Sequence, residues 1–498
     1  MLAFYDTLLA IAWNWPWMIV AGGACLFIKI LADELWSPIA RVPGVRPALL
    51  ARLLTLYHMA TGSFTAYTVS MSRRYGKLYR LSSNAVATTD VDAIRLIYSS
   101  TRFKKPECYR YFAFHRDSLL STRDIEHHRR LLLLSQKRLV GPVFSTTSIT
   151  ELEPLVYRAG AAAMAKRVAQ YADAGQPFDA MALSRLATLD VIGEVAFGGS
   201  FESLAMAQDE GSHPVFRWMN DMTHLGVLKQ VFGRLCQPWI MPRHFASERM
   251  LVEFTRSVVQ GRMAAIASDH PTTRDHAAKD VLQRLIEAVD PATGDRLDVD
   301  QIIAESIVQL TLHLLMEHPD VYHRLERELL AAIPDRDQAI SHATVRHLPL
   351  LNAVLYESMR LRPVGSASQR VVPSGGMVIA GVYLPPGLVV HPITSGVHLL
   401  PEIFGDDAEC FRPDRWLAAT PEQLRGMRQC LLTFSLGARA CIGRSLAWME
   451  LRLMLSVLVR RFVLSIPPCT KTDMTPVQRF GLKPRGGRLD VLAVHRTK

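Results

Sequence analysis

Phe434-Ser435-Leu436-Gly437-Ala438-Arg439-Ala440-Cys441-Ile442-Gly443 is the most informative stretch of this chain, and a helical run from Arg444 to Leu458 follows it. A cysteine held this way can be an iron ligand. The two glycines let the backbone fold tightly around the sulfur, because glycine adopts φ/ψ values that a Cβ forbids. Backbone N–H groups at the start of the following helix then point at the sulfur and favour thiolate over thiol. The pattern therefore predicts that Cys441 is a metal ligand.

Two neighbours of the cysteine fit a haem. Phe434 can pack against the sulfur and exclude water, and Arg439 can reach a haem propionate as a charged donor. A buried cysteine in a loop is the common alternative, but five fixed residue types within ten positions disfavour it. The segment resembles the haem-binding loop of the cytochrome P-450 superfamily, the haem-thiolate monooxygenases. The resemblance implies a mainly α fold with small β-sheets and one large haem domain. It also implies haem b as cofactor, held by Cys441 with Phe434, Gly437, Arg439 and Gly443.

A second motif supports the same resemblance. Glu357 and Arg360 are three residues apart, so they share one helix face and can pair. Residues 411–416, Phe-Arg-Pro-Asp-Arg-Trp, resemble the family's F-x-P-E-R-F segment. The resemblance implies a buried triad of Glu357, Arg360 and Arg415. One carboxylate shared by two guanidinium groups can be buried only if all three are fully paired.

Strand-like sequence follows Pro363. Residues 369–376 resemble the family's strand region whose arginine, here Arg370, binds a propionate, and residues 381–387 resemble its hairpin. We expect small sheets near Val86 to Thr89 and Arg370 to Val390. Apolar residues at helical spacing dominate from Ile149 to Leu330, so we expect helices there.

The oxygen-activating helix departs from the family pattern. Its centre in the family carries a small residue and an acid–Thr pair, which relay protons to dioxygen. The corresponding residues 298–315 contain no glycine and no acid–Thr pair. By comparison about fifteen residues, roughly 22 Å of helix, are missing. Thr311 is a weak candidate for the catalytic alcohol, and Glu305-Ser306 and His313 are read as ordinary polar helix positions.

A second irregularity precedes it. The family carries an aromatic residue or histidine followed four residues later by an arginine that faces a propionate. Removing residues 131–136 places Arg138 at that spacing from His128. Both changes are in frame, so mispredicted exon boundaries are the simplest account and a divergent variant is the alternative.

The N-terminus predicts a membrane anchor. Residues 7–28 carry no charge and are long enough to span a bilayer, although Asn14 and Pro16 interrupt them. The first Lys or Arg of the chain is Lys29, and arginines follow this run. Because positive charges favour the cytoplasmic side of a membrane, we expect the body to lie in the cytoplasm. A signal peptide, the rival reading, would carry a basic n-region. We expect an anchor at 1–31, a Pro-rich hinge at 32–48 and a catalytic domain at 49–498, in the endoplasmic reticulum membrane.

Charge and cysteine content bear on partners. The formal charge is +11, and Arg425, Arg428 and Arg444 flank the Cys loop, where an NADPH-dependent reductase would approach. No nucleic-acid motif is present. Seven cysteines lack C-x-x-C spacing, which is typical of thiols in a reducing compartment.

Three functions remain open from the sequence. The first is a monooxygenase that uses O2 and NADPH electrons to oxidise an apolar small molecule, in fungal secondary metabolism by resemblance. The second is a haem-thiolate isomerase or dehydratase, or a peroxide user, which needs no acid–alcohol pair. The third is an inactive haem-binding chain.

Overall fold

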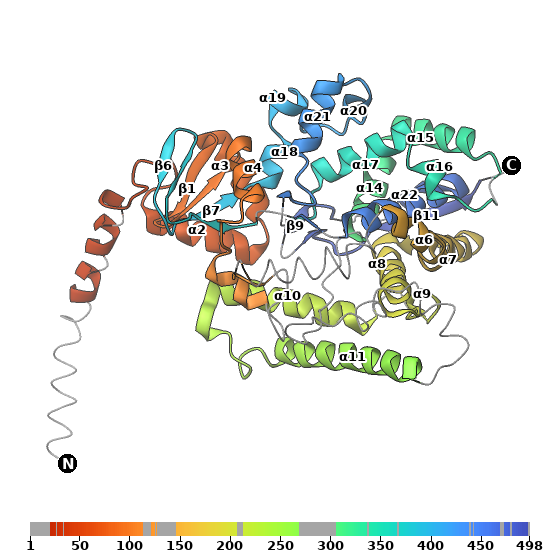
Figure 1. The fold of residues 1–498 in the computed structure, drawn as a ribbon, viewed down its shortest axis with the longest axis horizontal. Helices are drawn as coiled ribbons and strands as arrows, with labels where there is room; N and C mark the ends of the chain where they lie inside the picture. Colours follow the sequence, from red (N-terminus) through yellow and green to blue (C-terminus); the bar gives the residue numbers. More distant parts are fainter. Residues whose placement is uncertain are drawn as a thin grey trace, which may run out of the picture.

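The computed structural model is mainly helical, with small sheets both on the left of the view and further toward its middle and right (Figure 1). This confirms the fold class expected from the sequence. The structure describes residues 20–25, 27–32, 34–112, 121–124, 126, 146–206, 213–267, 305–335, 338–365, 368–437, 440–441, 443–468, 473–478 and 481–496.

The helices fall into four groups along the chain. The first group is α2 (Ala48–Thr61), α3 (Phe64–Tyr75) and α4 (Val91–Ser99). The second is α6 (Thr146–Val156), α7 (Ala163–Asp173), α8 (Ala180–Ile192), α9 (Ser203–Met206), α10 (Pro214–Phe232) and α11 (Pro242–Ala267). The third is α14 (Glu305–Glu317), α15 (Pro319–Ala332), α16 (His342–Val345) and α17 (Pro349–Leu361). The last is α18 (Thr394–His398), α19 (Pro401–Phe404), α20 (Asp414–Leu417), α21 (Pro421–Cys430) and α22 (Arg444–Arg461).

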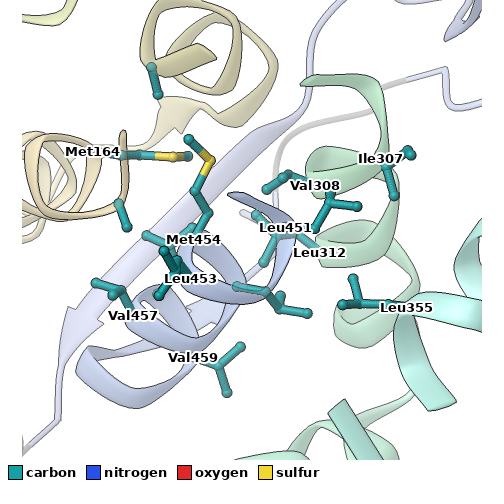
Figure 2. Close-up of a cluster of buried hydrophobic side chains, with 14 of the residues drawn as sticks. Met164, Ile307, Val308, Leu312, Leu355, Leu451, Leu453, Met454, Val457 and Val459 are labelled. Atoms are coloured by element: carbon teal, nitrogen blue, oxygen red, sulfur yellow. The ribbon is translucent and has the colours of Figure 1, made fainter. Parts of the chain in front are cut away.

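Helix α22 forms the centre of the largest hydrophobic core. It is apolar around most of its circumference, and residues 446–451 and 453–460 are buried, as expected for a helix enclosed by others. Figure 2 shows Leu451 and Met454 facing Val308 and Leu312 of α14 and Met164 of α7. Each large aliphatic side chain buried in this way contributes about 1.5–3 kcal/mol. This packing fixes the helix that follows the Cys loop.

The principal sheet joins segments that lie far apart in the sequence. Its strand order is β1 (Leu78–Ser82), β2 (Ala85–Thr88), β7 (Val389–Pro392) and β4 (Arg370–Val371). β2 and β7 are parallel, and β4 runs antiparallel to β7 with Arg370 opposite Val390. The predicted strand near residues 86–89 and the two ends of the predicted segment 370–390 therefore belong to one sheet.

The other strands are short. β5 (Met377–Ile379) and β6 (Val382–Leu384) form the predicted hairpin, whereas β9 (Pro476–Gln478) pairs with β10 (Leu482–Pro484). A three-stranded sheet has the order β3 (Phe178–Asp179), β11 (Asp490–His495) and β8 (Phe462–Ser465).

Helix boundaries follow local chemistry. The Thr420 hydroxyl accepts the backbone N–H of Gln423, whose side chain accepts the Thr420 N–H, so α21 begins with a capping box and a proline at its first position. Asp90 caps α4 through the N–H of Ala93. Helix α17 ends at Leu361, just before Arg362-Pro363, because a residue that precedes proline disfavours helical φ/ψ.

The N-terminal region was predicted to hold a membrane anchor and a hinge. In the described part of the chain, no helix is both long and apolar enough to cross a bilayer. Residues 1–19 of the predicted anchor lie outside the described residues. Within the predicted hinge, Ile39 and Val42 are buried, and Arg80 of β1 donates to Glu34 at 3.0 Å. The segment from Glu34 onward therefore packs on the body.

Candidate cofactor site

The loop that carries Cys441 is tied to its surroundings at both ends. At its start, the Thr433 hydroxyl donates to the Met359 carbonyl of α17 at 3.0 Å. At its end, the Cys441 N–H donates to the Phe434 carbonyl at 2.9 Å, which closes the loop on itself. Phe434 is buried in the main core, and Gly443 directly precedes α22. These bonds hold the sulfur at the N-terminal end of a fully packed helix.

Gly437 is required for this loop to approach its neighbour. Its φ is +64°, in the left-handed region that favours glycine. A Cβ at this position would lie 2.4 Å from the carbonyl oxygen of Tyr98 and 2.9 Å from the Cα of Ser99. The loop backbone therefore packs directly on the last turn of α4, and no other residue type fits there without a shift.

The environment of the Cys441 thiol contains two opposing influences. Burial raises the pKa of the thiol above its ordinary value. A hydrogen bond from the backbone N–H of Gly443 and the positive charge of Arg444 act in the opposite direction. A helix N-terminal N–H and a nearby cation stabilise negative charge on sulfur, so the site fits a thiolate bound to a metal.

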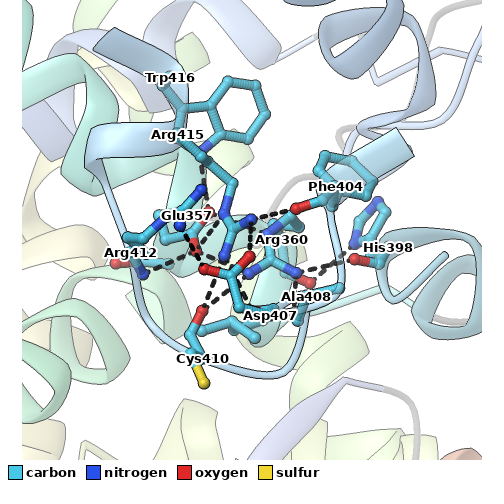
Figure 3. Close-up of polar contacts among 12 residues, drawn as sticks. Glu357, Arg360, His398, Phe404, Asp407, Ala408, Cys410, Arg412, Arg415 and Trp416 are labelled. Carbon is cyan, nitrogen blue, oxygen red and sulfur yellow. Dashed lines mark hydrogen bonds and ion pairs between the residues drawn. The ribbon is translucent and has the colours of Figure 1, made fainter. Parts of the chain in front are cut away.

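Glu357 of α17 lies at the centre of a buried polar network (Figure 3). Its carboxylate accepts from Arg360 Nη2 at 2.6 Å and Nε at 2.9 Å, and from Arg415 Nε at 3.0 Å. The Arg412 backbone N–H and the Trp416 indole N–H also donate to it, at 2.9 and 2.8 Å. Glu357 and Arg360 are fully buried. The structure thus brings together all three members of the predicted triad.

The two arginines have further partners that complete their pairing. Arg360 donates to the carbonyls of His398, Ala408 and Cys410. Arg415 donates to the Phe404 carbonyl and to the Asp407 carboxylate, the latter at 2.9 Å. Full pairing of this kind is what allows a buried carboxylate and two guanidinium groups to coexist.

His398 connects this network to the Cys loop. Its Nδ1–H donates to the Arg360 carbonyl at 2.9 Å, while its Nε2 accepts the Leu432 N–H at 2.8 Å, just before the loop. Complete burial lowers the pKa of His398 to about 3, so the ring is neutral and can make both bonds. The triad therefore positions the loop through one histidine.

Arg370 is the buried cation predicted to meet a propionate. Its exposed fraction is 3%, and its Nη1 donates to the Gln369 carbonyl at 2.8 Å. The guanidinium lies over the ring of Tyr98, 5.4 Å from the centroid, and bonds the Tyr109 hydroxyl. Among the described residues no carboxylate forms an ion pair with it. A buried guanidinium without a carboxylate fits a site for an anionic group such as a propionate.

The described part of the oxygen-activating region is α14. Thr311 is buried, and its hydroxyl donates to the Ile307 carbonyl of the same helix at 2.8 Å. His313 pairs with Glu317 at 3.2 Å, in line with its interpretation as a polar helix position. Residues 298–304 and the side chains of Glu305 and Ser306 lie outside the description.

Some predicted residues are not described. His128, Arg138, Arg439 and the extra segment 131–136 lie outside the described residues.

Sequence reasoning did not identify four residues that complete the site. Trp416 and Asp407 extend the Glu357 network, His398 joins it to the loop, and Tyr98 supports both Arg370 and Gly437. Trp416 offered a signal, because it adjoins Arg415 in the quoted motif. The other three come from separate segments, and no local pattern marks them.

Comparison with known proteins gives a consistent result. A family model described as cytochrome P450 matches residues 43–491. Cytochrome P450 monooxygenase hepC of Aspergillus oryzae is 28% identical, over 93% of this chain and 94% of its own. Cytochrome P450 monooxygenase gsfF of Penicillium aethiopicum is 27% identical, over 88% of this chain and 90% of its own. The solved heme domain of cytochrome P450DA aligns with a TM-score of 0.72 at 21% identity, covering 89% of this chain and 95% of that one, which confirms the expected fold.

Proposed function

Because the chain belongs to the cytochrome P450 family, we propose that it is a haem-thiolate monooxygenase of fungal secondary metabolism. It inserts one oxygen atom of O2 into an apolar small molecule, with electrons from an NADPH-dependent reductase. The observation that carries the proposal is the placement of Cys441 at the start of α22, where the Gly443 N–H meets its sulfur. The fungal relatives named as monooxygenases support the reaction class.

Several residues of this chain would bind haem b, each through a different contact. Cys441 provides the thiolate ligand, and the Gly443 N–H stabilises its negative charge. Phe434 and Arg370 are buried, so Phe434 would exclude water from the sulfur and Arg370 would neutralise a propionate of a bound haem. Arg439, His128 and Arg138 belong to the same set by resemblance. Haem, when bound, supplies the redox chemistry, which a thiolate ligand directs toward O–O cleavage.

The reductase that supplies the electrons is proposed to dock on the surface around the Cys loop. Arg425, Arg428 and Arg444 are exposed there. An exposed cationic surface attracts an acidic partner and accelerates its association, which supports docking of the reductase at this face.

A second function is favoured by one specific observation. The Thr311 hydroxyl is bound to its own helix, and the described residues of α14 offer no acid–Thr pair. A haem-thiolate isomerase or dehydratase needs no proton relay to dioxygen, and an inactive haem-binding chain needs none either. This observation favours the alternatives for the chain as encoded, whereas the placement of Cys441 and the relatives named as monooxygenases support the function proposed above.

Mispredicted exon boundaries would explain both irregularities together. They would account for the missing segment of the oxygen-activating helix and for the extra residues 131–136, and a divergent variant is the alternative. Sequencing the transcript across codons 128–145 and 300–320 tests this directly. A transcript identical to the encoded chain at both places contradicts it and leaves a divergent variant.

We also propose attachment to the endoplasmic reticulum membrane with the body in the cytoplasm, and exposed apolar side chains support the contact with lipid. Leu235 and Trp239, between α10 and α11, are 66% and 80% exposed. Leu53 and Tyr57 of α2, which contacts α10, are 54% and 61% exposed. Trp and Tyr favour the membrane interface. These side chains and the N-terminal residues together hold the protein on lipid.

Fractionation of cells tests the membrane proposal. A chain that starts at Pro38 should be released by salt or mild detergent more readily than the full chain. Trp239→Ser in the shortened chain should release it further, whereas the exposed Val378→Ser of β5 should not. Protease protection of the body inside sealed microsomes contradicts the cytoplasmic orientation.

Isotope labelling tests the reaction class. The purified chain, restored to its transcript, is supplied with reductase, NADPH and a panel of apolar substrates under ¹⁸O2. A product that carries one ¹⁸O atom is expected. Conversion that needs neither O2 nor NADPH contradicts the monooxygenase and identifies an isomerase or dehydratase.

A further inference from the structure

Tyr98 touches both elements that hold the proposed haem. It lies in the last turn of α4 and is 2% exposed. Its backbone carbonyl limits the approach of the Cys loop, because a Cβ on Gly437 would lie 2.4 Å from that oxygen. Its ring lies under the guanidinium of Arg370, 5.4 Å from the Arg370 Cζ. One residue therefore contacts the thiolate side and the propionate side of the site.

The ring holds Arg370 without neutralising it. Burial raises the pKa of Tyr98 to about 12, so the phenol is uncharged and the contact is a cation–π interaction. Within the described part of the chain, Arg370 also contacts the Gln369 carbonyl and the Tyr109 hydroxyl, which are uncharged. The positive charge of Arg370 thus remains available to an anionic group, while its direction is fixed.

Helix α4 gives Tyr98 a rigid base. Asp90 caps its first turn by accepting the Ala93 N–H at 2.9 Å. Ile94 and Ile97 are each 1% exposed and anchor the helix in the core beneath the principal sheet. Because its first turn is capped and one face is buried, α4 holds Tyr98, in its last turn, in a fixed position.

We propose that Tyr98 is a positioning residue. It fixes the distance between the Cys loop, on the thiolate side of the haem site, and Arg370, on the propionate side. The carbonyl sets the place of the loop, and the ring sets the direction of the guanidinium. This inference rests on the proposed function, because it requires that the chain binds haem.

A double-mutant cycle separates this role from simple core packing. The measured quantity is the rate at which the purified holoprotein transfers its haem to apomyoglobin. Tyr98→Leu should accelerate transfer by about threefold to thirtyfold, the range of cation–π contacts from exposed to buried sites. Tyr98→Phe retains the ring and should stay within about twofold of wild type. In an Arg370→Met background, Tyr98→Leu should have almost no further effect.

Ile97→Ala provides the matched control, because it removes a buried side chain from the same helix. It should change the transfer rate less than Tyr98→Leu does. The role of Tyr98 is overturned if Tyr98→Leu acts equally in the Arg370→Met background, if Tyr98→Phe behaves like Tyr98→Leu, or if Ile97→Ala has the same effect. A wild-type chain that takes up no haem overturns the proposed function itself and Tyr98's role with it.

Discussion

Replacing Glu357 by glutamine removes the charge at the centre of the buried network. Three of the bonds to this carboxylate come from guanidinium nitrogens of Arg360 and Arg415, at 2.6, 2.9 and 3.0 Å. A glutamine amide supplies one acceptor oxygen, and its NH2 group opposes donors that already point at it. Two buried cations then lose their common counter-charge, although Arg415 keeps Asp407.

The expected loss is large because the side chains of Glu357, Arg360 and Arg415 are buried, with exposed fractions of 0%, 0% and 3%. Removing one partner of a buried ion pair costs about 3–5 kcal/mol. A folded domain is stable by about 5–15 kcal/mol in total, so Glu357→Gln should remove at least about a fifth of the free energy of unfolding. Urea unfolding followed by circular dichroism measures this change. The yield of haem-loaded protein should also fall, because His398 bonds both to Arg360 of the network and to Leu432 just before the Cys loop.

An exposed pair of the same spacing provides the control. Arg425 and Glu422 are also three residues apart, at 2.9 Å, but their side chains are 70% and 73% exposed. Glu422→Gln should change the free energy of unfolding by less than about 1 kcal/mol. If Glu357→Gln also costs less than about 1 kcal/mol, the account of the buried triad is refuted.

Three further outcomes are expected. The pKa of His398 is lowered to about 3, so the unfolded chain, with its ordinary pKa of about 6.5, binds a proton that the folded chain does not. The free energy of unfolding should therefore fall as the pH drops below about 6.5, and His398→Gln should flatten this slope by up to about 1.4 kcal/mol per pH unit in urea unfolding; an unchanged slope contradicts it. Gly437→Ala should lower the haem content of purified protein, because its Cβ would lie 2.4 Å from the Tyr98 carbonyl, whereas Gly426→Ala, which meets open space, should not. The encoded chain should turn over at least about 100-fold more slowly than one restored to its transcript, since general acid–base help is typically worth 10²–10⁴-fold; equal, well-coupled turnover that is lost in Thr311→Ala would instead assign the relay to Thr311.

Local patterns in the sequence predicted the parts of the site that depend on short spacing. Glu357 and Arg360 share a helix face because they are three residues apart, and the structure pairs them. Gly437 was expected to allow a tight loop, and its φ is +64°. Apolar spacing predicted helices between Ile149 and Leu330, whereas the fold class itself was implied by the resemblance of the Cys loop and the triad to the family.

Contacts between distant segments could not be predicted in the same way. His398 reaches Leu432 and Arg360, and Tyr98 reaches Arg370, 272 residues further along the chain. Such contacts depend on how helices and sheets pack, which no periodicity encodes. Strands β3 and β4 have two residues each, too few to show an alternating pattern.

The most direct test of the central claim is the absorption spectrum of the reduced, CO-treated protein. If Cys441 is the thiolate ligand, the wild-type chain shows the red-shifted Soret band of a thiolate-ligated haem and Cys441→Ala abolishes it. The buried Cys430 and the exposed Cys410 are the controls, and Cys430→Ala and Cys410→Ala should keep the band. A Cys441→Ala protein that retains the band contradicts the assignment.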